Sequence, residues 1–172
     1  MFYQTSNLKH LLFMGGMHMP SVGMVGQNGR EMAREFLRMS QGTASCYHIT
    51  ETQQQGPKLD VLVVSEASPV LTEVVPRLAP EGYLVVNADD KAIFPYLTPS
   101  NARLITYGFS NKACITASSV TDDNLHICIQ RAFTALDGAK RDPQEFSQAM
   151  GPVAASPEAT LGAAAVWAVV KG

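Results

Sequence analysis

The chain has 172 residues, of which 46% are hydrophobic and 16% are charged, and its formal net charge is −2. This length and composition predict one folded domain with one core and exclude an intrinsically disordered chain. The nearly neutral charge argues against nucleic acid or an anionic membrane as a partner, and no run approaches the roughly 18 apolar residues of a spanning helix.

The first well-defined element is a buried strand that leads through a glycine turn into a helix. Residues 21–39 read SVGMVGQNGREMAREFLRM, with glycines at positions 23, 26 and 29. Glycine accepts a positive φ at little cost and lets a ligand approach the backbone closely. A helix that begins at Gly29–Arg30 would aim its free N–H groups and positive dipole end into this turn, which predicts an anion site. The preceding stretch 8–14 fits either a strand or a short helix.

The helix after the turn is predicted to be amphipathic and to end at Gln41–Gly42. The pairs Glu31–Arg34 and Glu35–Arg38 have the i, i+3 spacing expected on a solvent-exposed face. Its buried stripe is expected to comprise Met32, Ala33, Phe36 and Leu37.

Further strands are predicted at residues 43–50, 59–65, 83–86 and 103–107. The run LDVLVVS at 59–65 is apolar without interruption, which is typical of a strand covered on both faces in a parallel sheet. Helices are expected after residue 68, ended or kinked by a proline, and over residues 91–97.

Polar residues follow two of these strands, where open α/β sheets bind ligands. Glu66 follows residues 59–65 and is either a ligand for a metal or a ribose, or a carboxylate that favours a helix start. Asn87 follows residues 83–86, and the next residues, Asp89 and Asp90, are common helix caps.

The second part of the chain is predicted to form a small antiparallel ribbon over residues 108–150 and a helix over 156–170. We therefore predict one domain over residues 1–172 with a three-layer α/β fold. Its mainly parallel sheet occupies residues 21–107, and the ribbon is a small antiparallel appendage.

Several of these segments resemble the central ATPase domain of the Mur ligase family. GMVGQNGRE is similar to GVTGTNGKT, the ATP loop of Mur ligases and folylpolyglutamate synthetases. YLVVNADD, followed by RLITYGFSNKACITASSV, is similar to the end of that domain, and GPVAASPEATLGAAAVWAVV is placed like the family's GxHNxxNALAAxAAA helix. The resemblance covers roughly residues 21–170, in the family's order.

This resemblance implies a P-loop-type fold with ATP or another nucleotide and Mg²⁺ as cofactors. The metal candidates are Glu66 and Glu31. The nucleotide or phosphate would be bound by Gly26, Gln27, Asn28, Gly29, Arg30 and Asn87.

The chain departs from the family at the positions that perform its chemistry. The loop lysine aligns with Arg30 and the Mg²⁺-binding Thr/Ser with Glu31, a carboxylate that would repel a γ-phosphate unless a metal lay between them. The family's modified lysine has no room between Glu66 and Asn87, and its substrate and C-terminal domains have no counterpart. We expect a degenerate, cytoplasmic relative without ligase activity of its own. It would bind a nucleotide or phosphate weakly, or act through a partner protein or homo-oligomer.

Two other classes of enzyme are alternatives to a Mur ligase relative. SPVLTEVVPRLAPEGYLVVN is similar to a segment of S-adenosylmethionine-dependent methyltransferases, but the first loop reads GxxGxxG, and the nearest acidic residue after the second strand lies within His48–Glu51. A nucleophilic hydrolase would have to use Cys46, Cys114, Ser65 or Ser68, none of which lies in a catalytic motif. The odd cysteine count, three, instead fits reduced thiols.

Overall fold

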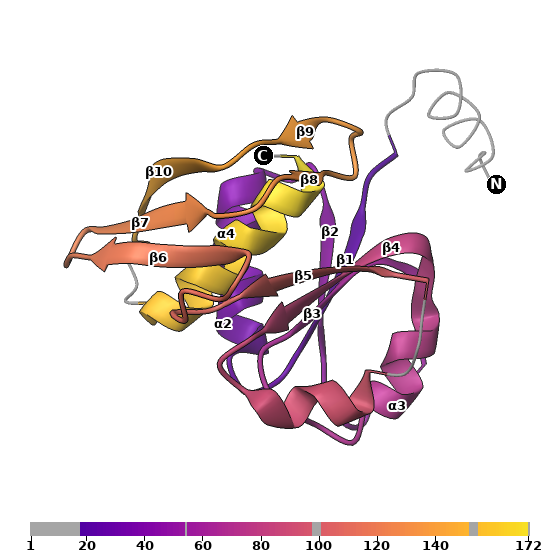
Figure 1. Ribbon diagram of the computed structural model, residues 1–172. Helices are drawn as coiled ribbons and strands as arrows, with labels where there is room; N and C mark the ends of the chain where they lie inside the picture. Colours follow the sequence, from indigo (N-terminus) through magenta and orange to yellow (C-terminus); the bar gives the residue numbers. More distant parts are fainter. Residues whose placement is uncertain (1–17, 54, 98–100, 152–154, 172) are drawn as a thin grey trace, which may run out of the picture.

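The computed structural model describes residues 18–53, 55–97, 101–151 and 155–171. Its centre is an eight-stranded sheet in the order β10-β7-β6-β5-β4-β3-β1-β2 (Figure 1). The strands of this sheet are β1 (Ser21–Val25), β2 (Ser45–Ile49), β3 (Leu59–Val64), β4 (Leu78–Asn87), β5 (Arg103–Tyr107), β6 (Ile115–Val120), β7 (Asn124–Ile129) and β10 (Gln144–Ala149). A separate antiparallel pair consists of β8 (Phe133–Thr134) and β9 (Lys140–Arg141).

The parallel part of the sheet matches the prediction. Strands β2, β1, β3, β4 and β5 pair in parallel, and β3 is covered on both faces because its side chains alternate between two apolar clusters. The predicted ribbon is also present, since β6, β7 and β10 pair antiparallel. It continues the main sheet through the pair Tyr107–Ile115 between β5 and β6.

Helices cover both faces of the sheet, which confirms the three-layer α/β fold (Figure 1). One face carries α2 (Gly29–Ser40) and α4 (Pro157–Val170), which pack against each other. The other face carries α3 (Leu71–Val74) and the 3₁₀ helices η1 (Val75–Arg77) and η2 (Lys91–Tyr96). Prolines within η1 and η2 explain why the helices predicted there are short and tightly wound.

The helix α4 begins at the predicted cap and is buried on nearly every side. The Ser156 side chain accepts a hydrogen bond from the Ala159 N–H, at 3.2 Å. Gly162 lets α4 approach α2, because a Cβ there would lie 2.3 Å from the sulfur of Met32. A helix with small, apolar residues all round can pack against a helix and a sheet at once, as α4 packs against α2 and the sheet.

The buried face of α2 differs from the predicted stripe. Met32, Ala33 and Phe36 are buried as expected, but Leu37 is 45% exposed and Glu35 only 2% exposed. The predicted solvent face of charged pairs is therefore wrong at Glu35. Glu35 is buried because this side of α2 faces α4. The contact between these two helices joins segments that are far apart in sequence. The stretch 8–14 lies outside the described residues.

Two alanine variants of neighbouring residues test this corrected orientation of α2. Phe36→Ala should lower the free energy of unfolding by about 3–5 kcal/mol, because it empties a fully buried site. Leu37→Ala should change it by no more than about 0.5 kcal/mol. Urea unfolding followed by circular dichroism measures both, and equal losses would contradict the observed orientation.

Candidate functional site

The glycine turn between β1 and α2 is built as the sequence predicts. Gly26 has a φ of +112°, and a Cβ there would lie 2.2 Å from the Ser65 hydroxyl and 2.9 Å from the Glu66 nitrogen. The Gly29 N–H donates to the Gly26 carbonyl at 2.9 Å, and α2 begins at Gly29. Position 26 therefore requires glycine both for its backbone conformation and for its close contact with the end of β3.

The carboxylate of Glu66 contacts this turn. Glu66 Oε2 accepts a hydrogen bond from the Gln27 N–H at 3.2 Å. Within the described residues, Asn28 provides no side-chain cap for α2. The start of α2 thus offers backbone donors, one of which Glu66 already holds.

A cavity of about 320 Å³ adjoins the turn at the carboxyl ends of β1, β2 and β3. The residues that line it include Gly26, Gln27, His48, Glu51 and Glu66. Its size lies at the lower end of the range for small-molecule sites. In the part of the chain that the structure describes, no group of three or more His, Cys, Asp or Glu side chains is arranged to hold a metal.

The other predicted nucleotide residues lie apart from this cavity. Asn28 and Asn87 line a space of about 20 Å³, enough for about one water molecule. Asn87 donates from Nδ2 to the Ser65 carbonyl at 3.1 Å and accepts from the Asp89 N–H at 3.0 Å. Asn87 therefore links the ends of β3 and β4.

The two aspartates after β4 hold neighbouring loops. Asp90 caps η2 by accepting from the Ala92 N–H at 3.0 Å, as the cap interpretation predicts. Asp89 accepts from the N–H groups of Phe109 and Ser110, at 2.7 and 3.1 Å, and so holds the turn after β5. Burial and the Asp89 charge raise the pKa of Tyr107 above its ordinary range.

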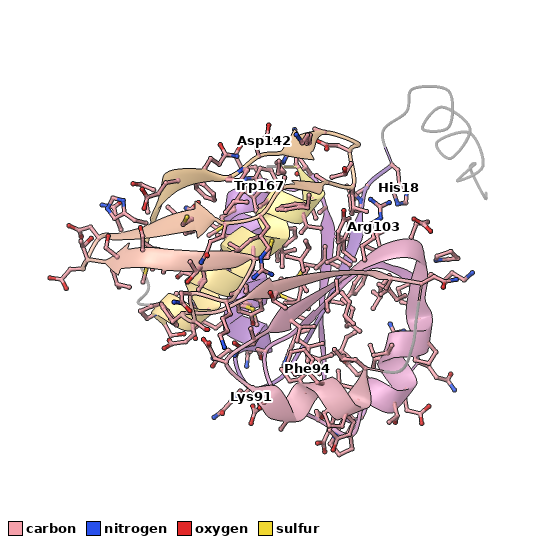
Figure 2. The ribbon with its side chains drawn as sticks, in the orientation of Figure 1. His18, Lys91, Phe94, Arg103, Asp142 and Trp167 are labelled. Atoms are coloured by element: carbon pink, nitrogen blue, oxygen red, sulfur yellow. The ribbon has the colours of Figure 1, made fainter. Side chains whose placement is uncertain are left out.

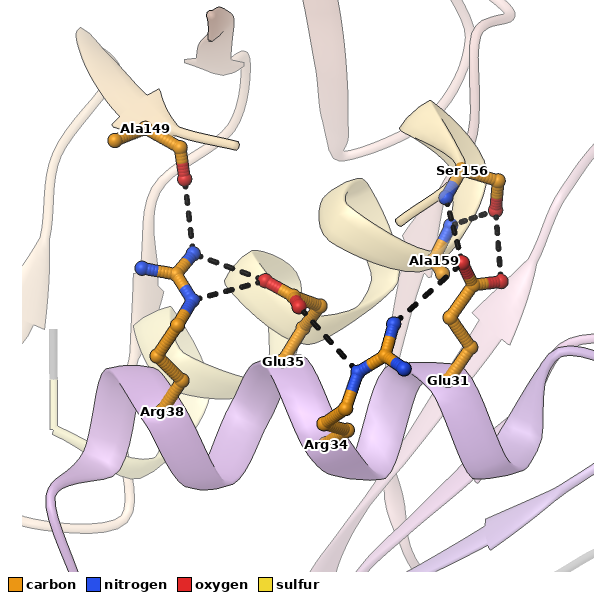
Figure 3. Close-up of polar contacts among 7 residues, drawn as sticks. All are labelled: Glu31, Arg34, Glu35, Arg38, Ala149, Ser156 and Ala159. Carbon is orange, nitrogen blue, oxygen red and sulfur yellow. Dashed lines mark hydrogen bonds and ion pairs between the residues drawn. The ribbon is translucent and has the colours of Figure 1, made fainter. Parts of the chain in front are cut away.

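Glu31 has a role that sequence reasoning missed (Figure 3). Its carboxylate accepts from the Ser156 N–H at 2.8 Å and from the Ser156 hydroxyl at 3.3 Å, at the positive end of α4. Both oxygens are engaged within the protein, and metal binding by Glu31 stays a prediction. The neighbouring Arg30 is exposed and makes no hydrogen bond or ion pair with any described residue.

The same face of α2 carries a second ionic contact (Figure 3). Buried Glu35 pairs with Arg38 at 2.9 Å and lies 3.8 Å from Arg34. Arg38 also donates to the Ala149 carbonyl at 2.9 Å, at the end of β10. The i, i+3 spacing identified the Glu35–Arg38 pair, but spacing alone does not reveal that Arg38 joins α2 to a distant strand.

The candidate nucleophiles occupy structural positions. Burial raises the pKa of the Cys46 thiol to about 12, opposed by the Tyr47 backbone, and burial also raises that of Cys114, opposed by Arg131. The Ser65 hydroxyl donates to the Val25 carbonyl at 3.1 Å, and the Ser68 hydroxyl accepts from the Val70 N–H at 3.4 Å. The arrangement gives no support to a nucleophilic hydrolase.

Comparison with known proteins supports the fold and not an activity. No family model matches the sequence, and no curated protein matches it. Among solved structures, the chain is similar to MurF from Acinetobacter baumannii, with a TM-score of 0.51 and 8% identity. The match covers 87% of this chain and 42% of the MurF chain, so this chain spans less than half of that protein. The fold is thus α/β and is similar to that of part of MurF.

Among the described residues, no helix has the length and apolar character needed to cross a bilayer.

Removing the carboxylate of Glu31 tests its structural role. Glu31→Ala should lower the free energy of unfolding by about 2 kcal/mol, because the Ser156 N–H loses its partner at the start of α4. The matched variant Glu158→Ala removes an exposed carboxylate from the first turn of α4 and should cost at most about 0.5 kcal/mol.

Chemical unfolding with and without Mg²⁺ measures both effects. Equal losses in the two variants would contradict the capping role. Stabilisation by Mg²⁺ of the wild type but not of Glu31→Ala would instead make Glu31 a metal ligand.

Proposed function

We propose that this chain is a Mur ligase-like domain that binds a nucleotide or another phosphate-bearing ligand weakly at the glycine turn and does not ligate on its own. The observation that carries the proposal is the turn itself. Gly26 adopts a positive φ against the end of β3, and α2 begins three residues later without a side-chain cap among the described residues. Backbone donors at a helix start favour phosphate.

The surrounding charges support weak binding. Exposed Arg30 offers a guanidinium at the first turn of α2, and arginine binds phosphate well. Glu66 opposes this, since its carboxylate holds the Gln27 N–H and would repel an anion. Glu66 is also the kind of oxygen ligand that Mg²⁺ prefers, so it would hold a Mg²⁺ ion that accompanies the phosphates and offsets this repulsion.

Ligation by this chain alone is not supported by the residues beside the turn. In the resemblance, the family's loop lysine aligns with Arg30, and its Mg²⁺-binding Thr/Ser aligns with Glu31. Glu31 is engaged with Ser156, at the start of α4. A cytoplasmic role beside a partner protein or a second copy fits this arrangement.

One observation favours an alternative ligand. Glu51, just beyond the end of β2, lines the same cavity as the glycine turn. An acidic residue in that place binds ribose hydroxyls in Rossmann-type folds. S-adenosylmethionine is therefore the competing ligand, and the protein would then be methyltransferase-like.

Thermal melting with added ligands tests the proposal. ATP with Mg²⁺ or ADP with Mg²⁺, at about 100 times the dissociation constant, should add roughly 2.7 kcal/mol to the free energy of unfolding. Stabilisation by S-adenosylmethionine alone would favour the alternative. No response to any nucleotide at millimolar concentration would overturn nucleotide binding.

Variants near the turn assign the ligand to this site. Arg30→Gln should leave the stability within about 0.5 kcal/mol and weaken nucleotide binding several-fold, whereas Lys58→Gln, at an exposed lysine just before the amino end of β3, should not weaken it. Glu66→Gln should reduce the dependence of ATP binding on Mg²⁺, because the repulsion is removed. Titration calorimetry measures these affinities, and unchanged binding in both turn variants would place the ligand elsewhere.

A further inference from the structure

We propose that the outer edge of β5, flanked by Arg103 and Arg131, binds an extended peptide that carries a carboxylate. The peptide would add to β5 as a strand, and its carboxylate would meet the two guanidinium groups. This site is independent of the glycine turn.

The edge of β5 is unpaired along most of its length. On one side β4 pairs with all of Arg103–Tyr107, but on the other side, within the described residues, β6 pairs only at Tyr107. The Tyr107 carbonyl accepts from the Ala88 N–H at 2.8 Å, so Tyr107 turns its backbone toward β4. Because backbone direction alternates along a strand, Leu104 turns its N–H and C=O outward, and Thr106 turns its N–H outward, whereas the Thr106 carbonyl faces Ile115 in the single pair with β6.

A cavity of about 430 Å³ lies along this edge. Its opposite wall is the segment that leads from β7 into β8, including Arg131 and Phe133. Leu104 is 51% exposed beside it and provides an apolar contact for a ligand side chain. The volume falls within the range of ligand sites.

The two guanidinium groups have little anionic compensation. Arg103 donates from Nη1 to the Tyr83 hydroxyl at 3.1 Å and lies over the Tyr83 ring, 4.9 Å from its centroid. Its buried Nε has no hydrogen-bond partner among the described residues, and the nearest carboxylate, exposed Glu81, is 3.7 Å away. Arg131 donates to the Lys112 carbonyl at 2.9 Å and forms no ion pair with a carboxylate of the described residues.

These features together favour a peptide over a small anion. Guanidinium groups alone would bind any carboxylate or phosphate. The outward N–H and C=O groups of Leu104 and the outward N–H of Thr106 add a pattern that an extended backbone complements, as in recognition by strand addition.

The site lies away from the candidate nucleotide cavity. Strands β1, β3, β4 and β5 run in the same direction, and the glycine turn follows the carboxyl end of β1, whereas Arg103 opens β5. Figure 2 shows Arg103 at the end of the sheet where the chain enters near His18, with Lys91 at the opposite end.

Two peptide pools test the proposal on the full chain. One pool holds pentapeptides with four randomised positions and a C-terminal glutamate, and the matched pool ends in glutamine amide. The acidic pool should shift the NMR amide signals of Leu104 and Thr106 and slow their hydrogen exchange, with at least tenfold tighter binding than the amide pool. Inorganic phosphate is titrated separately.

Paired variants separate the backbone contact from the charge contact. Leu104→Pro removes an outward N–H without breaking the ladder to β4 and should abolish binding, whereas Leu104→Ala keeps the N–H and should retain most of it. Arg131→Gln and Arg103→Gln should each weaken binding about tenfold. Lys91→Gln removes an equal charge elsewhere and should not change it.

Three results would overturn the proposal. The first is that the acidic pool at millimolar concentration does not shift the NMR amide signals of Leu104 and Thr106. The second is equal binding of both pools, and the third is binding of phosphate without binding of peptide. Circular dichroism of each variant confirms folding, and Arg131→Gln, at an exposed residue, keeps the test valid if Leu104→Pro does not fold. Nucleotide binding is measured in the same samples, so failure at one site is distinguishable from failure at the other.

Discussion

The structure depends on the way α4 is fixed against α2 and the sheet. The sides of α4 are almost entirely small and apolar, so they give tight packing and few directional contacts. Directional contacts are made instead by the two ends of α4. At the amino end, Glu31 accepts two hydrogen bonds from Ser156, and at the carboxyl end the Leu136 N–H donates to the Val169 carbonyl. With both ends held, the packing of α4 determines which side of α2 is buried.

The same physical principle recurs at the two long helices. Each has a positive amino end, and each has a carboxylate from elsewhere in the chain close to it. Glu31 contacts the start of α4, and Glu66 contacts the turn that leads into α2. These contacts stabilise the fold internally, and they also set the cost of placing a further anion at the start of α2, because an added phosphate must compete with Glu66 or be accompanied by a cation.

Features that are local in sequence were predicted well. The uninterrupted apolar run of β3, the glycine turn and the Ser156 cap each arise from a few adjacent residues, and the structure has all three. Features that depend on distant segments were not predicted. The burial of Glu35 and the exposure of Leu37 depend on α4, which lies more than a hundred residues later in the chain. The cavity beside β5 is equally non-local, since it exists because β6 begins only beside the last residue of β5.

The contrast between Arg30 and Glu31 shows how the fold constrains some positions near a site and leaves others open. Arg30 is exposed and has no contact with a described residue that would fix its identity, so the fold sets no requirement there. Glu31, the next residue, contacts the start of α4, and its loss would leave a backbone donor without a partner. Adjacent positions at one helix start are therefore under different physical constraints. A substitution at Arg30 that alters which ligand the turn binds costs little stability. The same kind of substitution at Glu31 requires a new hydrogen-bond partner for the start of α4.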